Sequence, residues 1–415
     1  PSNARDPAHH SSPYALSVRE IRRIVQAFAK AARRCRDGEL DGIEVLATTH
    51  LLGQFLSPIS NYRADDYGGS IENRMRFLLE VLEACRETVD ETFIVGLRIA
   101  PDESNEGGLS LQEGLEVIDA VVKQGSVDYL NVNGAYAGTD MGLAETYGGM
   151  AFPSAPYIEL ARRVRERSGL PTFQAARLTD PATANWAVEN QYVDMAGMVR
   201  PHMADPAIVN KLETGREVEI RPCVGAGYCL DRVYGGRDAA CIHNVSTGRE
   251  GTLPTGIPSA PATRTAWVVG GGPAGLEAAR VLALRGHEVS LFEAASDLGG
   301  QVRLAAKAAG RRDLVGIVDW LAGEVDRLGV ATHTNRYIEA GDVSSASVEI
   351  VIIATGGIPD TDLVNGGGEL LMTTWDVLSG QPIDPSASVI VCDEVGAHGA
   401  LSVVDHLIGQ VADLS

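Results

Sequence analysis

Three of the six cysteines of this chain fall within the twenty-four residues RPCVGAGYCLDRVYGGRDAACIHN, from Arg221 to Asn244. Thiolates at such spacing commonly hold a zinc ion or an iron–sulfur cluster. Ala226 stands where a C-x2-C motif would supply another thiol, and His243 follows two residues after the last cysteine of the group. We therefore predict a structural zinc clip whose ligands are Cys223, Cys229, Cys241 and His243. Two alternatives stay open: a [4Fe-4S] cluster with a fourth ligand other than cysteine, and thiols that hold no metal.

A glycine-rich turn follows the cysteines in TAWVVGGGPAGLEAARVLALRGHEVSLFEA. Gly270, Gly272 and Gly275 form G-x-G-x-x-G between an expected strand and helix, and Glu293 ends the next strand 18 residues later. Such glycines let a pyrophosphate approach a helix N-terminus, while the acid binds ribose hydroxyls. The motif predicts FAD or an ADP moiety, with Gln301 as a further cofactor-binding residue. The alternative is a nucleotide fold that has lost its nucleotide.

Another group of polar residues occupies the carboxyl ends of strands expected in the first half. The helix expected at 17–35 begins with a capping box of Ser17 and Glu20. Helices are also expected at 70–88, 111–124, 155–168 and 181–189. Strands are expected at Gly42–Thr48, Phe93–Ala100, Asp128–Asn133, Thr172–Arg177 and Asp194–Arg200. The polar residues at or just after these strands are His50, Arg98, Asn133, Arg177 and Arg200.

A doubly wound sheet and a (β/α)8 barrel both give this alternation, but no glycine-rich turn follows the first strand. Polar residues at strand ends are typical of the catalytic face of a barrel. The predicted fold class is therefore α/β: a (β/α)8 TIM barrel whose N-terminal strands are absent from this chain, then a Rossmann-like FAD/NAD-type nucleotide-binding domain. The predicted domains are 1–220 for the partial barrel, 221–263 for the cysteine-rich segment and linker, and 264–415 for the nucleotide domain. The strand–turn–helix unit SVIVCDEVGAHGALSVVDHL indicates that this last domain is incomplete.

Composition narrows the class of partner. The formal net charge of −20 disfavours nucleic acid or an anionic membrane as the main partner. No run approaches the roughly 18 apolar residues of a membrane span, and the N-terminal stretch has no apolar signal region. Six cysteines with three clustered fit a reduced compartment, so we expect a cytoplasmic protein that handles small molecules.

Several stretches carry a family resemblance. SPISNYRADDYGGSIENRMRFLLEVLEA resembles the loop and helix of old-yellow-enzyme-type flavin barrels, and VDMAGMVRPHMADPAIVNKL resembles their last strand. The cysteine stretch and GGGPAG resemble the multidomain, trimethylamine dehydrogenase-like branch. THLLGQFLSP is similar to a stretch of the dimethylglycine and N-methylproline demethylases. The resemblance implies FMN in the barrel, a [4Fe-4S] cluster, and a flavoprotein-like nucleotide domain.

The resemblance also implies residue roles in the barrel. Arg98 would lie beside the flavin pyrimidine, where a cation stabilises the reduced ring; the alternative is an arginine paired with a carboxylate such as Asp102. His50 would contact or deprotonate the substrate, or be a structural histidine. Asn133 and two loop tyrosines, Tyr136 and Tyr147, would lie in the region that covers the flavin. The aromatic faces of the tyrosines would hold a methylammonium group by cation–π attraction. The phosphate grip would be Ala176, Arg177, Val199 and Arg200.

One departure from the family pattern guides the prediction of function. Many flavin barrels carry H-x-x-H or H-x-x-N at the end of the first strand seen here, where Leu46 and Thr49 stand. The loss of these imidazoles disfavours enoate reduction. We predict an FMN-dependent oxidoreductase that oxidises an N-methylated amine or amino acid, giving the demethylated amine and formaldehyde. Its partners would be the amine, an electron-acceptor protein or subunit, and further copies of the chain in an oligomer.

Two other functions remain as alternatives. One is an NAD(P)H-dependent enoate reductase of the 2,4-dienoyl-CoA type. The other is an electron-transfer or scaffold subunit with an inactive barrel.

Overall fold

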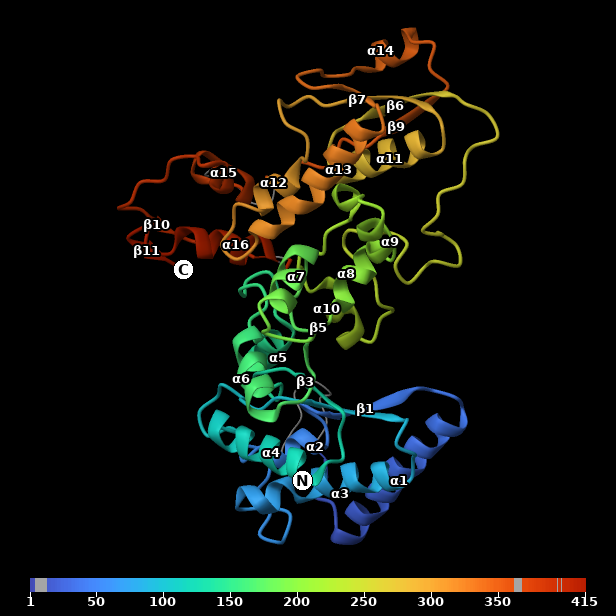
Figure 1. Cartoon of the computed structure of the whole chain (residues 1–415). Helices are drawn as coiled ribbons and strands as arrows, with labels where there is room; N and C mark the ends of the chain where they lie inside the picture. Colours follow the sequence, from blue (N-terminus) through green and yellow to red (C-terminus); the bar gives the residue numbers. More distant parts are fainter. Residues whose placement is uncertain (4–12, 362–367, 394, 397) are drawn as a thin grey trace. The chain divides into compact units, whose positions relative to one another are not determined.

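In the computed structural model the chain divides into two compact units, residues 1–200 and 201–415 (Figure 1). The structure describes residues 1–3, 13–361, 368–393, 395–396 and 398–415. Part of the expected irregular lead, residues 4–12, lies outside this set, as do positions 394 and 397 of the last expected strand–turn–helix unit.

The first unit contains a five-stranded parallel sheet in the simple order β1-β2-β3-β4-β5. All five strands were predicted, and each is shorter than expected. Because the strands are parallel and neighbours in sequence order, their carboxyl ends meet at one edge. Their bounds are β1 (Gly42–Ala47), β2 (Ile94–Ile99), β3 (Tyr129–Val132), β4 (Thr172–Gln174) and β5 (Met195–Ala196).

Helices alternate with these strands, as the periodicity of the sequence predicted. The first helix begins at the predicted capping box, with the Ser17 side chain accepting from the Glu20 amide and the Glu20 side chain accepting from the Ser17 amide. Two short helices, α2 and α5, were not predicted. The helices of this unit are α1 (Val18–Asp37), α2 (Leu52–Leu56), α3 (Ile71–Glu87), α4 (Leu111–Gln124), α5 (Asp140–Tyr147), α6 (Ile158–Ser168) and α7 (Pro181–Glu189).

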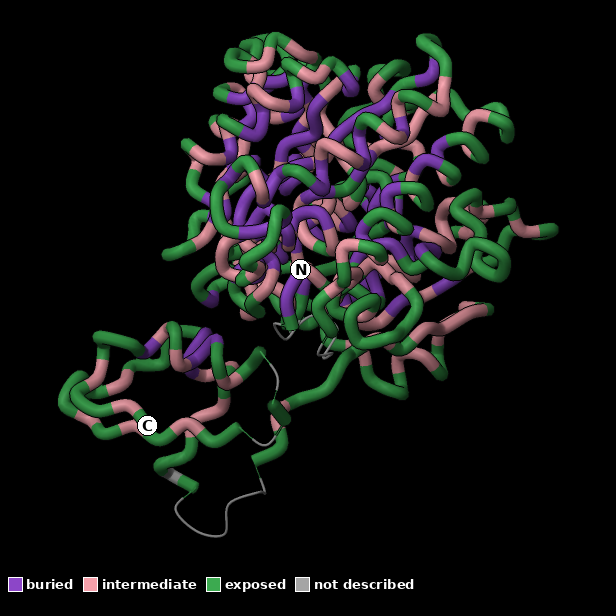
Figure 2. Tube along the Cα trace, turned by 90° about the horizontal axis from the view of Figure 1, so that it is seen from below, coloured by how far each residue is buried: buried purple, intermediate pink, exposed green. Residues whose placement is uncertain are grey.

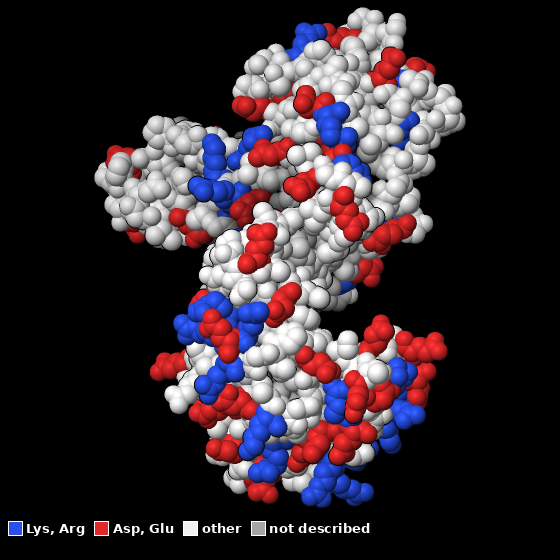
Figure 3. Space-filling model, in the orientation of Figure 1, with Lys and Arg blue, Asp and Glu red and all other residues white. Residues whose placement is uncertain are grey.

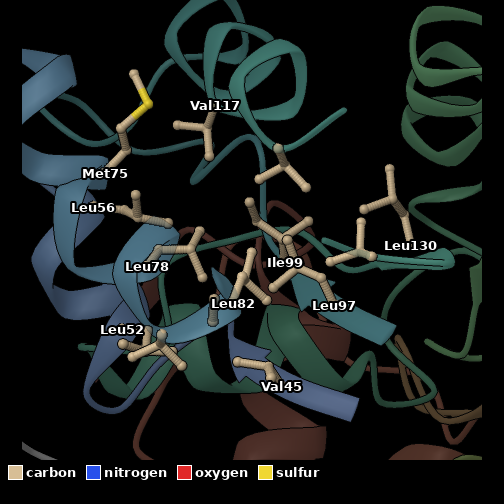
Figure 4. Close-up of a cluster of buried hydrophobic side chains, with 14 of the residues drawn as sticks. Val45, Leu52, Leu56, Met75, Leu78, Leu82, Leu97, Ile99, Val117 and Leu130 are labelled. Carbon is tan, nitrogen blue, oxygen red and sulfur yellow. The ribbon is translucent and has the colours of Figure 1, made fainter. Parts of the chain in front are cut away.

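The core of the first unit lies between one face of the sheet and the helices. Alternate strand residues such as Val45, Leu97 and Leu130 are buried against α3 residues that include Leu78 and Leu82 (Figure 4). Figure 2 marks the buried residues of the described chain in purple. Removing one such side chain to alanine costs about 2 to 5 kcal/mol. The opposite face of the same strands carries polar side chains, because successive residues of a strand point to opposite faces. This division of faces positions the candidate site.

One predicted strand ends early. The segment expected to be strand through Arg200 turns into helix α8 (Val199–Ala204) after the two residues of β5. Pro201 is compatible with a first helical turn, where a missing amide leaves no bond unmade. Val199 and Arg200 therefore lie on a helix rather than at the end of a strand.

The second unit contains a four-stranded parallel sheet in the order β8-β7-β6-β9, with α11 and α13 packed together. A smaller cluster of Val377, Leu378, Val403 and Leu407 joins α15 and α16. The strands are β6 (Thr265–Val269), β7 (Glu288–Phe292), β8 (Ala331–His333), β9 (Ile350–Ile353), β10 (Ser388–Val389) and β11 (Asp413–Leu414). The helices are α9 (Ile208–Glu213), α10 (Tyr228–Tyr234), α11 (Pro273–Leu284), α12 (Gln301–Ala305), α13 (Val315–Arg327), α14 (Ala340–Ser345), α15 (Thr374–Ser379) and α16 (His398–Leu407).

Charge on the first unit is mixed rather than segregated in the view of Figure 3, where acidic and basic side chains lie next to one another. Many of these side chains are paired, for example Arg167 with Asp119 at 2.6 Å and Arg162 with Glu159 at 2.6 Å. Among the described residues, no helix has the length and apolar character needed to cross a membrane.

Candidate functional site

The carboxyl edge of the five-stranded sheet brings together most of the polar residues predicted for the barrel. His50 is exposed in the turn between β1 and α2. Arg98 is the fifth residue of β2, and Asn133 directly follows β3. Arg177 is buried in the turn after β4. Parallel strands therefore present these side chains along one edge, as the sequence predicted.

Glu44 of β1 connects three strands on the polar face of the sheet. Its Oε1 lies 2.8 Å from Arg98 Nε on β2. Its Oε2 accepts hydrogen bonds from Asn131 Nδ2 at 2.8 Å and from Tyr129 Oη at 3.1 Å, both on β3. The Arg98 Nε has no hydrogen-bond partner with good geometry among the described residues, so its contact with Glu44 is an ion pair rather than an aligned hydrogen bond. The predicted alternative, an arginine paired with a carboxylate, is therefore observed, with Glu44 as the partner rather than Asp102.

The electrostatics of this cluster follow from its carboxylate. Burial, and then the nearby charge of Glu44, raise the pKa of Tyr129 to about 12. Tyr129 is thus a neutral hydrogen-bond donor across the ordinary pH range. Its ring stacks on Phe173 with 4.6 Å between centroids, which fixes the direction of the hydroxyl.

Buried polar atoms without a partner indicate where a ligand fits at this edge. In the described chain, Asn133 Oδ1 and Gln174 Oε1 are both buried without a hydrogen-bond partner. Such atoms are rare in native proteins, and they mark the place of a ligand, a water or a functional role. Backbone strain gathers here too, since Ala135 and Arg177 have positive φ angles of 66° and 48°. Arg98 and Asn133 fit a planar, hydrogen-bonding ring such as the flavin of FMN, whereas Gln174 is paired with Val132 and lies on the core face of the sheet.

The residues predicted to bind the FMN phosphate are only partly brought together. Arg200 donates from both terminal amino groups to backbone carbonyls, those of Tyr147 and Gly148. In this structure it therefore fixes the loop after α5. The Arg177 carbonyl accepts from the Ala155 amide at 3.1 Å. Assignment of Ala176, Arg177, Val199 and Arg200 to a phosphate remains a prediction.

The loop tyrosines lie in a tightly packed segment after β3. A side chain added at Gly138 would come within 2.3 Å of the Tyr136 ring, and one at Gly134 within 2.4 Å of the Tyr157 ring. Tyr157 also donates to the Glu145 carbonyl at 2.9 Å. Glycine at both positions thus lets aromatic rings lie flat against the backbone. The predicted roles of Tyr136 and Tyr147 toward a substrate remain untested.

A buried carboxyl supports the same edge from the loop after β2. Glu103 is 6% exposed, and its Oε2 accepts from the Ser57 hydroxyl and the Leu109 amide, each at 2.7 Å. Burial raises its pKa above the usual 4.5. Glu103 therefore joins the loops that follow β1 and β2.

The glycine-rich turn of the second unit has the geometry expected for a dinucleotide site. Gly270 has φ 109°, and a side chain at Gly275 would lie 1.8 Å from the Gly270 carbonyl oxygen, so neither tolerates another residue. Gly272 caps α11, and no atom lies within 4 Å of the point where a side chain on it would begin, which leaves open space at the helix N-terminus. That space is where a pyrophosphate approaches.

Glu293 stands at the same turn, as predicted. Its two carboxylate oxygens accept from the backbone amides of Gly271 at 2.7 Å and Ala295 at 2.8 Å. Gln301 Nε2 donates to the Gly357 carbonyl at 2.9 Å, linking the turn to the one after β9. The donors and the open space fit an ADP-bearing group, and a role of Glu293 toward ribose remains a prediction.

The cysteine segment is not arranged as a ready-made metal centre in the described residues, and its predicted ligands remain a prediction. Among the described residues, no group of three or more His, Cys, Asp or Glu side chains is arranged to hold a metal ion. His243 is buried and its Nδ1 lies 3.1 Å from the Pro222 carbonyl oxygen. Burial, and then the charge of Arg221, lower its pKa to about 4. The buried imidazole is therefore neutral near pH 7. Zinc is not shown by this geometry, and no chemical step is assigned to this segment.

A charged cluster holds the start of the cysteine segment in place instead. Arg221 lies over the Trp320 ring with 4.5 Å between its Cζ and the ring centroid, and it pairs with Glu277 at 3.3 Å. It also donates to the His243 carbonyl. Glu277 is shared with Arg280 at 2.8 Å. The segment is thus tied to helices α11 and α13.

Comparison with known proteins agrees with both halves of the chain. The family model described as "NADH:flavin oxidoreductase / NADH oxidase family" matches residues 2–219. The chain belongs to this family. Its first unit carries five strands of the TIM-barrel domain of these flavin oxidoreductases, and a second model, "NAD(P)-binding Rossmann-like domain", matches residues 268–316. The predicted fold class is confirmed.

Two relatives of this chain have names that refer to the oxidation of N-methylated amines. The chain is 46% identical over 407 residues to the "Probable N-methylproline demethylase" of Rhizobium meliloti, covering 98% of this chain and 60% of the relative. It is 42% identical over 422 residues to the "N,N-dimethylglycine/sarcosine dehydrogenase" of Chromohalobacter salexigens, covering 99% and 61%. The chain thus spans about three fifths of the length of these relatives.

A solved structure resembles the chain over most of its length. The 6-hydroxypseudooxynicotine amine oxidase of Pseudomonas geniculata N1 matches with a TM-score of 0.89 at 29% identity, covering 96% of this chain and 61% of that one. The resemblance to amine-oxidising members of the flavin oxidoreductase family, predicted from the sequence stretches, is confirmed.

Sequence reasoning did not identify Glu44 or Glu103. A signal for Glu44 was present, because it is the only charged residue of the strand Gly42–Ala47. Its partners on β3 lie 85 and 87 residues further along the chain, so their identity required the register of the sheet.

Proposed function

We propose that this chain is part of an FMN-dependent oxidoreductase that oxidatively demethylates a small N-methylated amine or amino acid. The observation that carries the proposal is the pairing of Leu46 with Arg98 in the register of β1 and β2. Leu46 is 42% exposed on the polar face, at a position where many flavin barrels have a histidine. The edge thus offers a cation for the flavin and an aliphatic wall instead of an imidazole donor for a carbonyl. An N-methyl group fits such a wall.

Bound FMN would supply the hydride acceptor for this chemistry. Loss of a hydride from the N-methyl carbon gives an iminium ion, and water converts it to the demethylated amine and formaldehyde with release of one proton. His50, exposed at the edge, takes the proton from the substrate ammonium so that the amine is neutral before oxidation. Arg98 would stabilise negative charge beside the flavin, and the buried Asn133 Oδ1 would be an acceptor for a donor of the ring.

The remaining parts of the proposal concern the other cofactors and partners. The second unit holds FAD or an ADP moiety at Gly272 and Glu293. Electrons leave to an acceptor protein or subunit, and the protein works as an oligomer in the cytoplasm. Metal analysis with a visible spectrum of the purified protein separates zinc, an iron–sulfur cluster and no metal in the cysteine segment.

Anaerobic reduction of the bound flavin tests the function. Dimethylglycine, sarcosine or N-methylproline should bleach the flavin absorbance and release one formaldehyde for each flavin reduced, whereas NADPH should act far more slowly. Rapid bleaching by NADPH together with no response to the N-methylated amines would instead establish the enoate reductase alternative. A barrel that binds no flavin would support the scaffold alternative.

A further inference from the structure

We infer that Glu44 is the positioning residue for Arg98, and that it sets the redox potential of the flavin by holding the guanidinium in place. The inference deepens the proposed function and rests on its placement of FMN at this edge. Glu44 touches no reacting atom in this assignment and acts through Arg98. It is the shared acceptor at the centre of a cluster built from three strands.

The two carboxylate oxygens of Glu44 contact different partners. Oε2 accepts from Asn131 and Tyr129, which holds the carboxylate still from the β3 side. Oε1 remains for Arg98 at 2.8 Å. A carboxylate fixed by two neutral donors has a defined position, so its ion pair can restrain an arginine.

Gly96 of β2 makes room for the cluster in the middle of the sheet. Tyr129 on β3 reaches Glu44 on β1 by passing over β2 at Gly96, where a side chain would lie 2.1 Å from the Tyr129 ring. Glycine at this position opens the path. The arrangement would have no purpose for simple core packing, because an apolar residue at each position would pack without the cost of burying charge.

Glu44 contacts one nitrogen of the Arg98 guanidinium. Glu44 contacts Nε, the guanidinium nitrogen nearest the chain. The Arg98 side chain is 39% exposed. Glu44 thus restrains the guanidinium at Nε, and its contact does not involve the terminal amino groups. Fixing a charge before the ligand arrives avoids the reorganisation that weakens a mobile one.

The redox potential of bound FMN distinguishes positioning of Arg98 from a simple charge effect of Glu44, because the two predict shifts of the potential in opposite directions. If Glu44 holds Arg98 in place, Glu44→Gln loosens the guanidinium and destabilises the reduced flavin, so the potential falls. If Glu44 acts only as a negative charge, its removal favours the reduced, anionic flavin and the potential rises. We expect the ratio of reduced to oxidised flavin at a fixed poise to fall about tenfold, a shift of about 30 mV for a two-electron couple.

The titration uses a chemical reductant and reference dyes on the protein with its flavin bound, so it needs no amine substrate. Glu44→Asp keeps the charge but shortens the arm, and it should lower the potential in the same direction. Arg98→Gln should lower the potential at least as far, and adding Glu44→Gln to it should produce little further change. Asp119→Asn is the matched control, since it removes one negative charge from the exposed Arg167 pair of the same unit and should leave the potential unchanged.

A raised potential in Glu44→Gln, a silent Glu44→Asp, or full additivity with Arg98→Gln would each overturn the inference. If Glu44→Gln does not fold, Glu44→Asp and Tyr129→Phe decide, because Tyr129→Phe removes one restraint on the carboxylate without altering charge and should lower the potential by a smaller amount. A wild-type protein that titrates as described but is not reduced by N-methylated amines would refute the proposed function alone. A protein without FMN at this edge would refute both.

Discussion

Two glycines of the same motif should respond differently to substitution by alanine. Gly275→Ala should destabilise the fold, whereas Gly272→Ala should weaken ADP binding and leave the fold intact. A side chain at Gly275 would lie 1.8 Å from the Gly270 carbonyl oxygen, and a backbone atom cannot move aside as a side chain does. We expect Gly275→Ala to lower the free energy of unfolding of the second unit by about 1 to 3 kcal/mol or more, the usual cost of overpacking. Binding of ADP should be lost with the turn.

Gly272→Ala should leave the fold intact and weaken the ligand. Gly272 has φ −73° and ψ 178°, which alanine adopts freely, and no atom lies within 4 Å of the added carbon. Alanine at an N-cap costs about 1 kcal/mol, and the stiffer unfolded chain returns about 0.4 to 1 kcal/mol. Stability should therefore change by less than about 1 kcal/mol. The added carbon would occupy the approach of the pyrophosphate, so ADP affinity should fall at least about tenfold, or 1.4 kcal/mol.

Urea unfolding followed by tryptophan fluorescence measures the first quantity, and calorimetric titration with ADP measures the second. Gly323→Ala is the control, because Gly323 lies within α13 with open space around it and should change neither ADP affinity nor the fold. Wild-type ADP affinity in Gly272→Ala would refute the assignment of the open space to a phosphate. Equal destabilisation by both substitutions would refute the steric argument.

Three further predictions concern single residues. Arg98→Ala should slow flavin reduction about a hundredfold or more while most FMN stays bound, since one preorganised charge is lost; stopped-flow rates and flavin content measure this, and unchanged rates with lost FMN would contradict it. Arg221→Ala should make the cysteine segment more sensitive to protease and lower the free energy of unfolding by about 2 to 3 kcal/mol. The cost is less than that of a fully unpaired buried charge, because Glu277 keeps its pair with Arg280. The control Arg237→Ala, in an exposed pair with Asp231, should cost less than about 1 kcal/mol. Burial raises the pKa of Glu103 above 4.5, so the folded state holds this proton more tightly than the unfolded chain. The stabilisation present below pH 4.5 should be lost as pH rises through the raised pKa. Glu103→Gln should flatten this part of the dependence of unfolding free energy, measured with urea, on pH; parallel curves for the two proteins would exclude the assignment.

Periodicity and glycine patterns were sufficient for most of the fold. The helix expected at 111–124 is observed with the same bounds, because its capping box and apolar spacing are local properties of the chain. The strand predicted through Arg200 failed because MAGMV reads as an apolar strand, although Pro201 permits a helix start. The metal centre could not be settled by spacing, since ligand geometry depends on how three separated segments fold together.

The residues missed by sequence reasoning share a physical cause. Arg98 was predicted because an arginine at a strand end matches a family role, but the partner that orients it depends on register between strands. Leu46 and Arg98 are paired across β1 and β2, which places Glu44 beside Gly96 two residues earlier on the same face. Local sequence shows only that Glu44 is a charge in an apolar strand. The third strand supplies its donors, so the cluster exists only after the sheet has formed.

Carboxylates organise both predicted cofactor edges, and they do so by different routes. Glu293 is held by two backbone amides, so its position is fixed by the glycine turn and persists whatever side chains surround it. Glu44 is held by side chains of β3, the strand beyond its neighbour β2, so single substitutions can release it. The barrel edge should therefore be the more adjustable of the two: changes at Tyr129 or Asn131 can alter the field at the flavin without touching the flavin, whereas the nucleotide edge changes only when its backbone does. A family that reacts with different substrates on one barrel would gain from placing its adjustable charge in this position.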